Sequence, residues 1–262
     1  MGERGSRRKG GAAEFMDHRA YSPGDDPRRI DWHVYARTGE PFVKLFRKEE
    51  DSVVRLVVDA SGSMRVGEPE KLHAAKKLAA GIGYMVMMRL ERAELCSTAD
   101  GRLSREAPLR GRGGVAPLLG HLSRMDAEGR TNLARAIDVL LSARGRPGAL
   151  VVVSDFFDPG PVLAALGRAR AAGHELSLIH VVAPEEEEPT LDGDLTLVDV
   201  ETGDAVDITA DPAALEAYAL RFAGLCEELR SFARRTAGAY VRTRTDAPLE
   251  EALARFVARE VD

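Results

Sequence analysis

The chain has 262 residues, a formal net charge of −5, 44% hydrophobic and 30% charged residues. This composition excludes a collagen-like or wholly disordered chain and allows one large domain with an added segment. The nearly balanced charge gives no reason to expect nucleic-acid binding. No run of 18 apolar residues and no apolar leader is present, so we expect no membrane span and a cytoplasmic location.

In chain order, the sequence predicts a disordered basic tail (residues 1–11), a signature segment (12–50) and a large domain (51–262). We expect the signature segment to contain a strand at residues 42–46 and to pack on the domain, with Trp32 in the contact. In the domain, buried apolar runs alternate with amphipathic stretches. The expected strands are 53–59, 94–98, 102–106, 149–154, 175–182 and 239–245, and the expected helices are 71–90, 115–125, 132–143, 161–172, 212–236 and 248–259.

This alternation predicts an α/β fold: a doubly wound, mostly parallel sheet of the Rossmann type with helices on both faces. A small β-hairpin insertion is expected at residues 195–208, and the acidic run at residues 185–188 is expected to be solvated surface. Cys96 and Cys226 are expected to be buried free thiols. Ligands of such folds bind at the carboxyl ends of the strands, near the topological switch point.

The most specific chemistry follows two of the buried strands. The first ends in Asp59-x-Ser61-x-Ser63, in which alternate side chains of an extended loop point the same way. The second is followed by Asp155, and Thr131 lies between the two in a polar turn before a helix. These carboxylates and hydroxyls are hard oxygen ligands that suit Mg²⁺ or Mn²⁺, whereas the lack of His or Cys disfavours Zn²⁺.

A structural alternative exists for the first loop, because Asp and Ser side chains also cap helices. The two aromatic residues after Asp155, Phe156 and Phe157, are either core residues or an apolar rim beside the ion. Both alternatives stay open at the level of the sequence.

The same residues resemble the metal-ion-dependent adhesion site (MIDAS) of von Willebrand factor A-like domains, from about residue 53 onward. The resemblance implies that Ser61 and Ser63 bind the ion directly, and Thr131 does so in the ligand-competent state. It implies that Asp59 and Asp155 act largely through water. This chain has Ser-Asp-Phe where the family usually has Thr-Asp-Gly after the fourth strand.

A second signature precedes the domain. Residues 21–37 read Tyr-x-Pro-Gly-Asp-Asp-x-Arg-x-Ile-Asp-Trp-x-x-x-Ala-Arg. This closely resembles the signature of the bacterial domain-of-unknown-function family 58, whose members carry a von Willebrand factor A-like domain after it. Many members of that family also have amino-terminal transmembrane helices. Because no such apolar run is visible here, this chain is expected to be a short, soluble form. The segment itself is either a structural brace or a partner-contact surface.

These resemblances imply a non-enzymatic, metal-dependent protein-interaction module that binds a partner's Asp or Glu carboxylate through Mg²⁺. They also imply a MoxR-type AAA+ ATPase as the partner, with this chain acting as its adaptor or co-chaperone. Two alternatives remain: a metal-dependent hydrolase, and a structural module with a degenerate metal site. No catalytic residue is predicted, since no general base stands in motif context.

Overall fold

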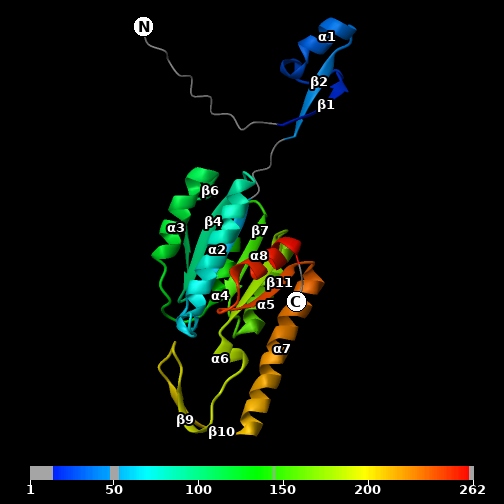
Figure 1. The fold of residues 1–262 in the computed structure, drawn as a ribbon. Coiled ribbons are helices and arrows are strands. Elements are labelled where there is room, and N and C mark those ends of the chain that lie inside the picture. The colour runs from blue at the N-terminus through cyan, green and yellow to red at the C-terminus, as the bar shows by residue number, and fades with distance from the viewer. Residues whose placement is uncertain (1–13, 48–52, 144, 260–262) are drawn as a thin grey trace, which may run out of the picture. The chain divides into compact units, whose positions relative to one another are not determined.

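The computed structural model describes residues 14–47, 53–143 and 145–259 (Figure 1). The chain divides into two compact units, Met1–Ser52 and Val53–Asp262. The predicted basic tail at residues 1–11 lies outside the described residues. The predicted packing of the signature segment on the large domain stays a prediction.

The smaller unit is built on a two-stranded antiparallel ribbon. Trp32 contacts Tyr35 within this unit, with the rings edge to face and their centroids 5.9 Å apart. The sequence pattern predicts only the second strand, because the other elements are short and lack apolar periodicity. The elements are β1 (Glu14–Ala20), η1 (Pro27–Arg29), α1 (Trp32–Thr38) and β2 (Phe42–Arg47).

Asp31 of the signature joins the parts of the smaller unit. Its Oδ1 accepts hydrogen bonds from the backbone N–H groups of His33 (3.0 Å) and Val34 (3.3 Å), which caps α1. Its Oδ2 lies 2.9 Å from His18 Nε2 on β1 and 3.3 Å from Lys44 Nζ on β2. These contacts, the His18 hydrogen bond first, hold the pKa of Asp31 below its usual value. One carboxylate therefore ties both strands to the helix.

Replacing Asp31 with alanine is expected to unfold the smaller unit locally. A unit of this size buries little surface, and the substitution removes the helix cap and both strand contacts together. Limited proteolysis should cut within residues 14–47 about tenfold faster than in the wild type. Asp26→Ala removes only the cap of η1 and is the control. Equal cleavage of the two variants would contradict this role of Asp31.

The larger unit is built around a seven-stranded sheet in the order β11-β8-β7-β3-β4-β5, with β6 paired to β4. The pairs from β11 to β4 are parallel, and β5 and β6 run antiparallel to β4. The doubly wound, mostly parallel architecture predicted from the sequence is confirmed. The strands are β3 (Val53–Asp59), β4 (Arg92–Ala99), β5 (Arg102–Arg105), β6 (Leu109–Arg110), β7 (Ala149–Ser154), β8 (Glu175–Val182) and β11 (Ala239–Arg244).

Helices cover both faces of this sheet (Figure 1). Successive residues of β3 enter the two cores, because side chains alternate across a strand: Leu56 packs with one helix layer and Val57 with the other. The first layer is α2 (Lys71–Met88), α3 (Val115–Ser123) and α8 (Leu249–Ala258). The second layer is α4 (Leu133–Ser142), α5 (Pro159–Ala171) and α7 (Pro212–Thr236).

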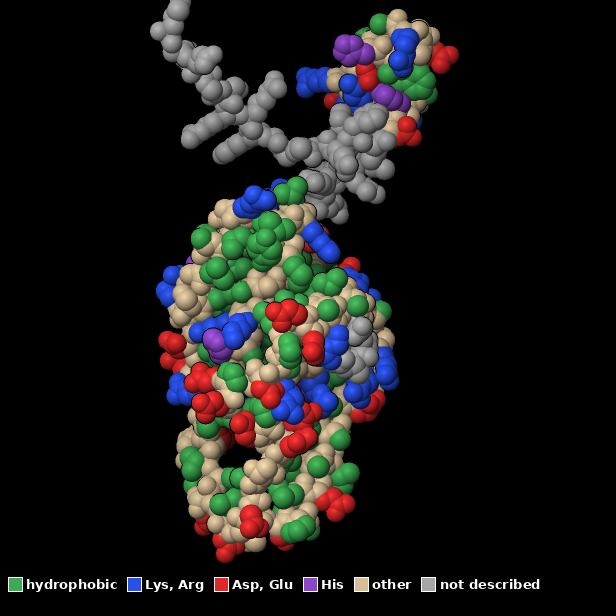
Figure 2. Space-filling view, in the orientation of Figure 1, with side chains coloured by type: hydrophobic (Ala, Val, Ile, Leu, Met, Phe, Trp, Pro, Cys, Tyr) green, Lys and Arg blue, Asp and Glu red, His purple; other side chains and the backbone are tan. Residues whose placement is uncertain are grey.

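The predicted hairpin is present as the antiparallel strands β9 (Gly193–Val198) and β10 (Ala205–Ala210). It forms a sheet of its own, and Figure 2 shows an opening between it and the rest of the larger unit. The remaining short elements are η2 (Gly62–Arg65), η3 (Arg112–Gly114) and α6 (Pro184–Glu187). Cys96 and Cys226 are buried and free, as predicted.

Across the described parts of the chain, no helix is both long and apolar enough to cross a membrane.

Candidate functional site

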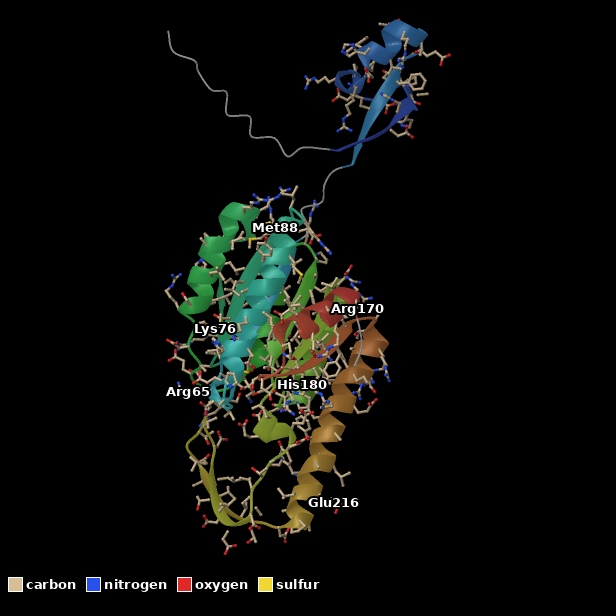
Figure 3. The ribbon with its side chains drawn as sticks, viewed as in Figure 1. Arg65, Lys76, Met88, Arg170, His180 and Glu216 are labelled. Atoms are coloured by element: carbon tan, nitrogen blue, oxygen red, sulfur yellow. The ribbon has the colours of Figure 1, made fainter. Side chains whose placement is uncertain are left out.

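The predicted site lies at the switch point of the sheet. β3 and β7 are neighbours, and the chain leaves β3 toward β4 but leaves β7 toward β8 on the other side. The residues after these two strands therefore meet at one edge of the sheet. In Figure 3 this edge is marked by Arg65, in the loop after β3, and by His180, near the end of β8.

The loop after β3 folds around the carboxylate of Asp59, which is buried. Its Oδ1 accepts the N–H of Ser61 at 3.0 Å, and its Oδ2 accepts the hydroxyl of Ser154 at 2.7 Å. The hydroxyl oxygens of Ser61 and Ser63 lie 3.1 Å apart. Ser61 stands at the N-cap of η2 but makes no side-chain capping bond. The helix-capping alternative therefore does not account for this loop.

The donor set of this loop fits a small divalent cation. Neighbouring ligands of an octahedral ion at 2.0–2.1 Å stand roughly 3 Å apart, close to the separation of the two serine oxygens. Burial, followed by the charge of Asp155, raises the pKa of Asp59 to about 6, so the pocket favours added positive charge. No group of three His, Cys, Asp or Glu side chains suited to a metal occurs in residues 14–47, 53–143 and 145–259. Mg²⁺ or Mn²⁺ would thus rely on the hydroxyls as well as the carboxylates.

Asp155 is paired with a lysine that the sequence pattern does not reveal. Lys71, the first residue of α2, is fully buried, and its Nζ lies 2.7 Å from Asp155 Oδ2. The same ammonium lies 2.5 Å from Glu186 Oε1. The other oxygen of Asp155 accepts the N–H of Phe157 at 3.4 Å. The edge of the sheet therefore contains a cation of the chain itself, held between two carboxylates.

Glu186 corrects the expectation that the acidic run at residues 185–188 is solvated surface. Its side chain is 13% exposed, and its Oε2 accepts the N–H of Ala183 at 2.9 Å. Burial is the main cause that raises the pKa of Glu186, and Lys71 opposes this rise. Glu187 is also partly buried and lies 3.1 Å from Arg242. The expectation is wrong for these two residues because the run begins the short helix α6 directly after buried β8.

The two aromatic residues after Asp155 have different environments. Phe156 is 2% exposed and belongs to the core, with a backbone φ of 52° that is uncommon for a residue other than glycine. Phe157 is 45% exposed, and the ammonium of Lys71 lies 4.7 Å from the centre of its ring. Phe156 is therefore a core residue, whereas Phe157 is exposed at the carboxyl edge of the sheet, where the alternative of an apolar rim would place it.

Thr131 comes to the site from the turn before α4. Its hydroxyl donates to Glu201 Oε1 at 2.5 Å, and its N–H donates to Glu201 Oε2 at 2.8 Å. Glu201 Oε1 also accepts the N–H of Ser63 at 3.3 Å. The structure thus joins Thr131 to the first loop through a glutamate from the β9–β10 turn. Sequence reasoning missed this glutamate because it lies far along the chain from both partners.

His180 lies behind the site on β8 and is fully buried. Its Nδ1 lies 3.0 Å from the hydroxyl of Tyr240. Burial, as the largest cause, lowers the pKa of His180 to about 3, so its ring is neutral at pH 7. A buried ring of this kind packs the core and is not placed to activate water as a general base.

Solved structures share this fold. A conserved hypothetical protein, BatB, from Bacteroides thetaiotaomicron aligns over 79% of this chain and 98% of its own, at 17% identity and a TM-score of 0.52. An aerotolerance-related membrane protein from Bacteroides fragilis aligns over the same shares at 18% identity and a TM-score of 0.52. A von Willebrand factor type A protein from Catenulispora acidiphila aligns over 83% of this chain and 43% of its own, at 17% identity and a TM-score of 0.43. The two Bacteroides proteins, with TM-scores above 0.5, therefore share the doubly wound, mostly parallel α/β fold of this chain.

The chain belongs to the family described as protein of unknown function DUF58, whose model matches residues 17–224. An uncharacterized protein of Mycobacterium tuberculosis is 32% identical over 254 residues, which cover 95% of this chain and 80% of its own length. An uncharacterized protein of Mycobacterium bovis matches with the same identity and coverage. The resemblance of the signature segment to this family is confirmed.

Proposed function

We propose that this chain is a non-enzymatic, metal-dependent protein-interaction module. The observation that carries the proposal is the hydrogen-bond network at the switch point of the sheet. Asp59 bonds Ser61 and Ser154, the hydroxyls of Ser61 and Ser63 are adjacent, and Glu201 joins Ser63 to Thr131. The proposed ligand set is Asp59, Ser61, Ser63, Thr131 and Asp155. The resemblance of the motif to the adhesion site of von Willebrand factor A-like domains and the membership of the DUF58 family support this class of function.

The residues of the proposed site have different roles. Ser61 and Ser63 present adjacent oxygens, and Asp59 is held by hydrogen bonds that fix its orientation. A bound Mg²⁺ or Mn²⁺ supplies an electrophilic centre for a carboxylate oxygen from the partner. Phe157, exposed beside Asp155, offers an apolar contact at the rim of the same surface. The proposed ligand is therefore an Asp or Glu side chain flanked by apolar groups.

The proposed partner is a MoxR-type AAA+ ATPase in the cytoplasm, with this chain as its adaptor or co-chaperone. This part of the proposal rests on the family resemblance. His180 is fully buried, and its lowered pKa makes it a weak base, which favours binding over the hydrolase alternative.

The double substitution Ser61→Ala/Ser63→Ala is expected to abolish ion binding and partner capture while the protein stays folded. Each hydroxyl contributes only about 1 kcal/mol to stability, and neither side chain buries much apolar area. The measurement is capture from a native lysate of the source organism, with Mg²⁺ or with EDTA, read by mass spectrometry. An ATPase recovered only by the wild type with Mg²⁺ is the expected result.

Ser104→Ala/Ser123→Ala removes two exposed hydroxyls away from the site and should behave like the wild type. Equal recovery of the same proteins by both double variants, with and without EDTA, would overturn the proposed function. Circular dichroism of each variant separates loss of binding from loss of fold.

A further inference from the structure

Glu201 brings a carboxylate of the chain itself to the place where a partner's carboxylate is expected. Three donors of the site bind it: the hydroxyl and the N–H of Thr131, and the N–H of Ser63. Both partners belong to the ligand set of the proposed function. A glutamate in this position satisfies the donors that an incoming acidic side chain would otherwise meet.

The turn between β9 and β10 is shaped to present this side chain. Asp199 accepts the N–H of Glu201 at 2.7 Å and that of Thr202 at 3.2 Å, which closes an Asx turn. The tip also comes close to the first loop of the site. A Cβ at Gly62 would lie 3.2 Å from the carbonyl oxygen of Val200 and 3.4 Å from Glu201 Cγ. Because position 62 is a glycine, no side chain stands where the hairpin tip approaches the loop.

The rest of the hairpin is weakly held. Among residues 193–210, all of them described, Ala210 alone is buried. Apolar side chains such as Val198 and Val206 are 60% and 61% exposed, so they add little burial energy to the closed position. The contact of Glu201 with the site is therefore the main restraint on the hairpin tip, and it is a contact that a competing carboxylate can replace.

We propose that Glu201 is a ligand of the chain's own ion site and that the β9–β10 hairpin closes this site until a partner's carboxylate displaces it. The inference rests on the proposed function, because it takes the ion site as given. Glu201 adds an oxygen to the five proposed protein ligands and leaves with the hairpin when the partner binds.

Closure of this kind sets the type of partner that can bind. A tethered carboxylate competes at an effective concentration on the order of millimolar. A free acidic peptide at micromolar concentration does not displace it. The partner must present an acidic side chain together with further contacts to the surrounding surface, as a folded protein does.

The test uses the whole chain and Mn²⁺ alone as the probe. Calorimetry gives the Mn²⁺ affinity, and hydrogen exchange follows the amides of residues 193–210 with and without the ion. In the wild type, Mn²⁺ should slow exchange in this hairpin about tenfold. Glu201→Gln should bind Mn²⁺ at least about tenfold more weakly, without protection of the hairpin. Asp204→Asn removes one charge from the same exposed turn and should match the wild type.

Acetate tests the displacement step. Above the effective concentration of the tethered group, on the order of millimolar, acetate should restore fast exchange in the Mn²⁺-loaded wild type, whereas chloride at equal ionic strength should not. Mn²⁺ binding of equal strength to wild type and Glu201→Gln, with an unchanged hairpin, would overturn this inference and leave the proposed function standing. Failure of every variant to bind Mn²⁺ would overturn both.

Discussion

Replacing Lys71 with methionine is expected to destabilise the protein by about 3–5 kcal/mol in the absence of divalent ions. The substitution keeps the length and helix propensity of the side chain but removes its charge. Asp155 and Glu186 then remain in a largely buried place without the ammonium that lies between them. The free energy of unfolding, measured by urea denaturation in EDTA, checks this result.

Lys77→Met is the matched control, because Lys77 is exposed on the same helix. Its effect should stay within about 0.5 kcal/mol. Mg²⁺ should restore more stability to Lys71→Met than to the wild type, since a divalent ion beside Asp155 replaces part of the missing charge. If the two lysine variants unfold at the same urea concentration, the buried ion pairs do not hold this edge of the sheet together.

The fold was predictable from local pattern. The buried strands at residues 53–59, 149–154 and 175–182 have the predicted bounds because each is a nearly continuous apolar run between polar ends. Helix α7 also has its predicted bounds, since Asp211 caps it and Pro212 stands at its first position. By contrast, β1 mixes acidic, basic and apolar residues within seven positions, and the sequence pattern gives it no signal.

The candidate site residues were predictable from one contiguous motif and from the ends of buried strands, whereas their partners Lys71 and Glu201 were not. Asp59, Ser61 and Ser63 lie within five positions of the chain, so their meeting follows from loop geometry alone. Lys71 and Asp155 are 84 positions apart, and Thr131 and Glu201 are 70 positions apart. These pairs form because elements distant in the chain pack together, and the neighbouring residues in the sequence do not indicate which residue will be the partner.

One of the missed residues did have a sequence signal. Pro184 stands at the first position of α6 and Glu186 at the third, directly after a buried strand. Proline at the start of a helix and glutamate two positions later are the pattern of a capped helix N-terminus. A glutamate that bonds the backbone at that point is held at the carboxyl edge of the sheet, where the site lies.

Asp59→Asn is expected to stabilise the ion-free protein at pH 7 by about 3 kcal/mol, and to have little effect at pH 4. The pKa of Asp59 is raised to about 6 in the folded protein, above the ordinary value of 3.8. Between these two values the folded state binds more protons than the unfolded state. The contribution of Asp59 to stability is therefore complete below about pH 4 and is lost as the pH rises through 6. Asparagine keeps the shape and the hydrogen bond to Ser61 but does not ionise.

The comparison of the two proteins isolates Asp59 from other titrating groups. The pKa of His180 is lowered to about 3 in the folded protein, so its contribution to stability falls as the pH falls. This contribution is the same in both proteins and cancels from the difference between them. Urea denaturation in EDTA from pH 4 to 7 gives this difference directly, with exposed Asp126→Asn as the control. In saturating Mg²⁺ the advantage of Asp59→Asn at pH 7 should shrink or reverse, because the ion stabilises only the protein that binds it. If the difference in unfolding free energy stays constant with pH, Asp59 is not a destabilising charge in this pocket, and no ion is needed to balance it.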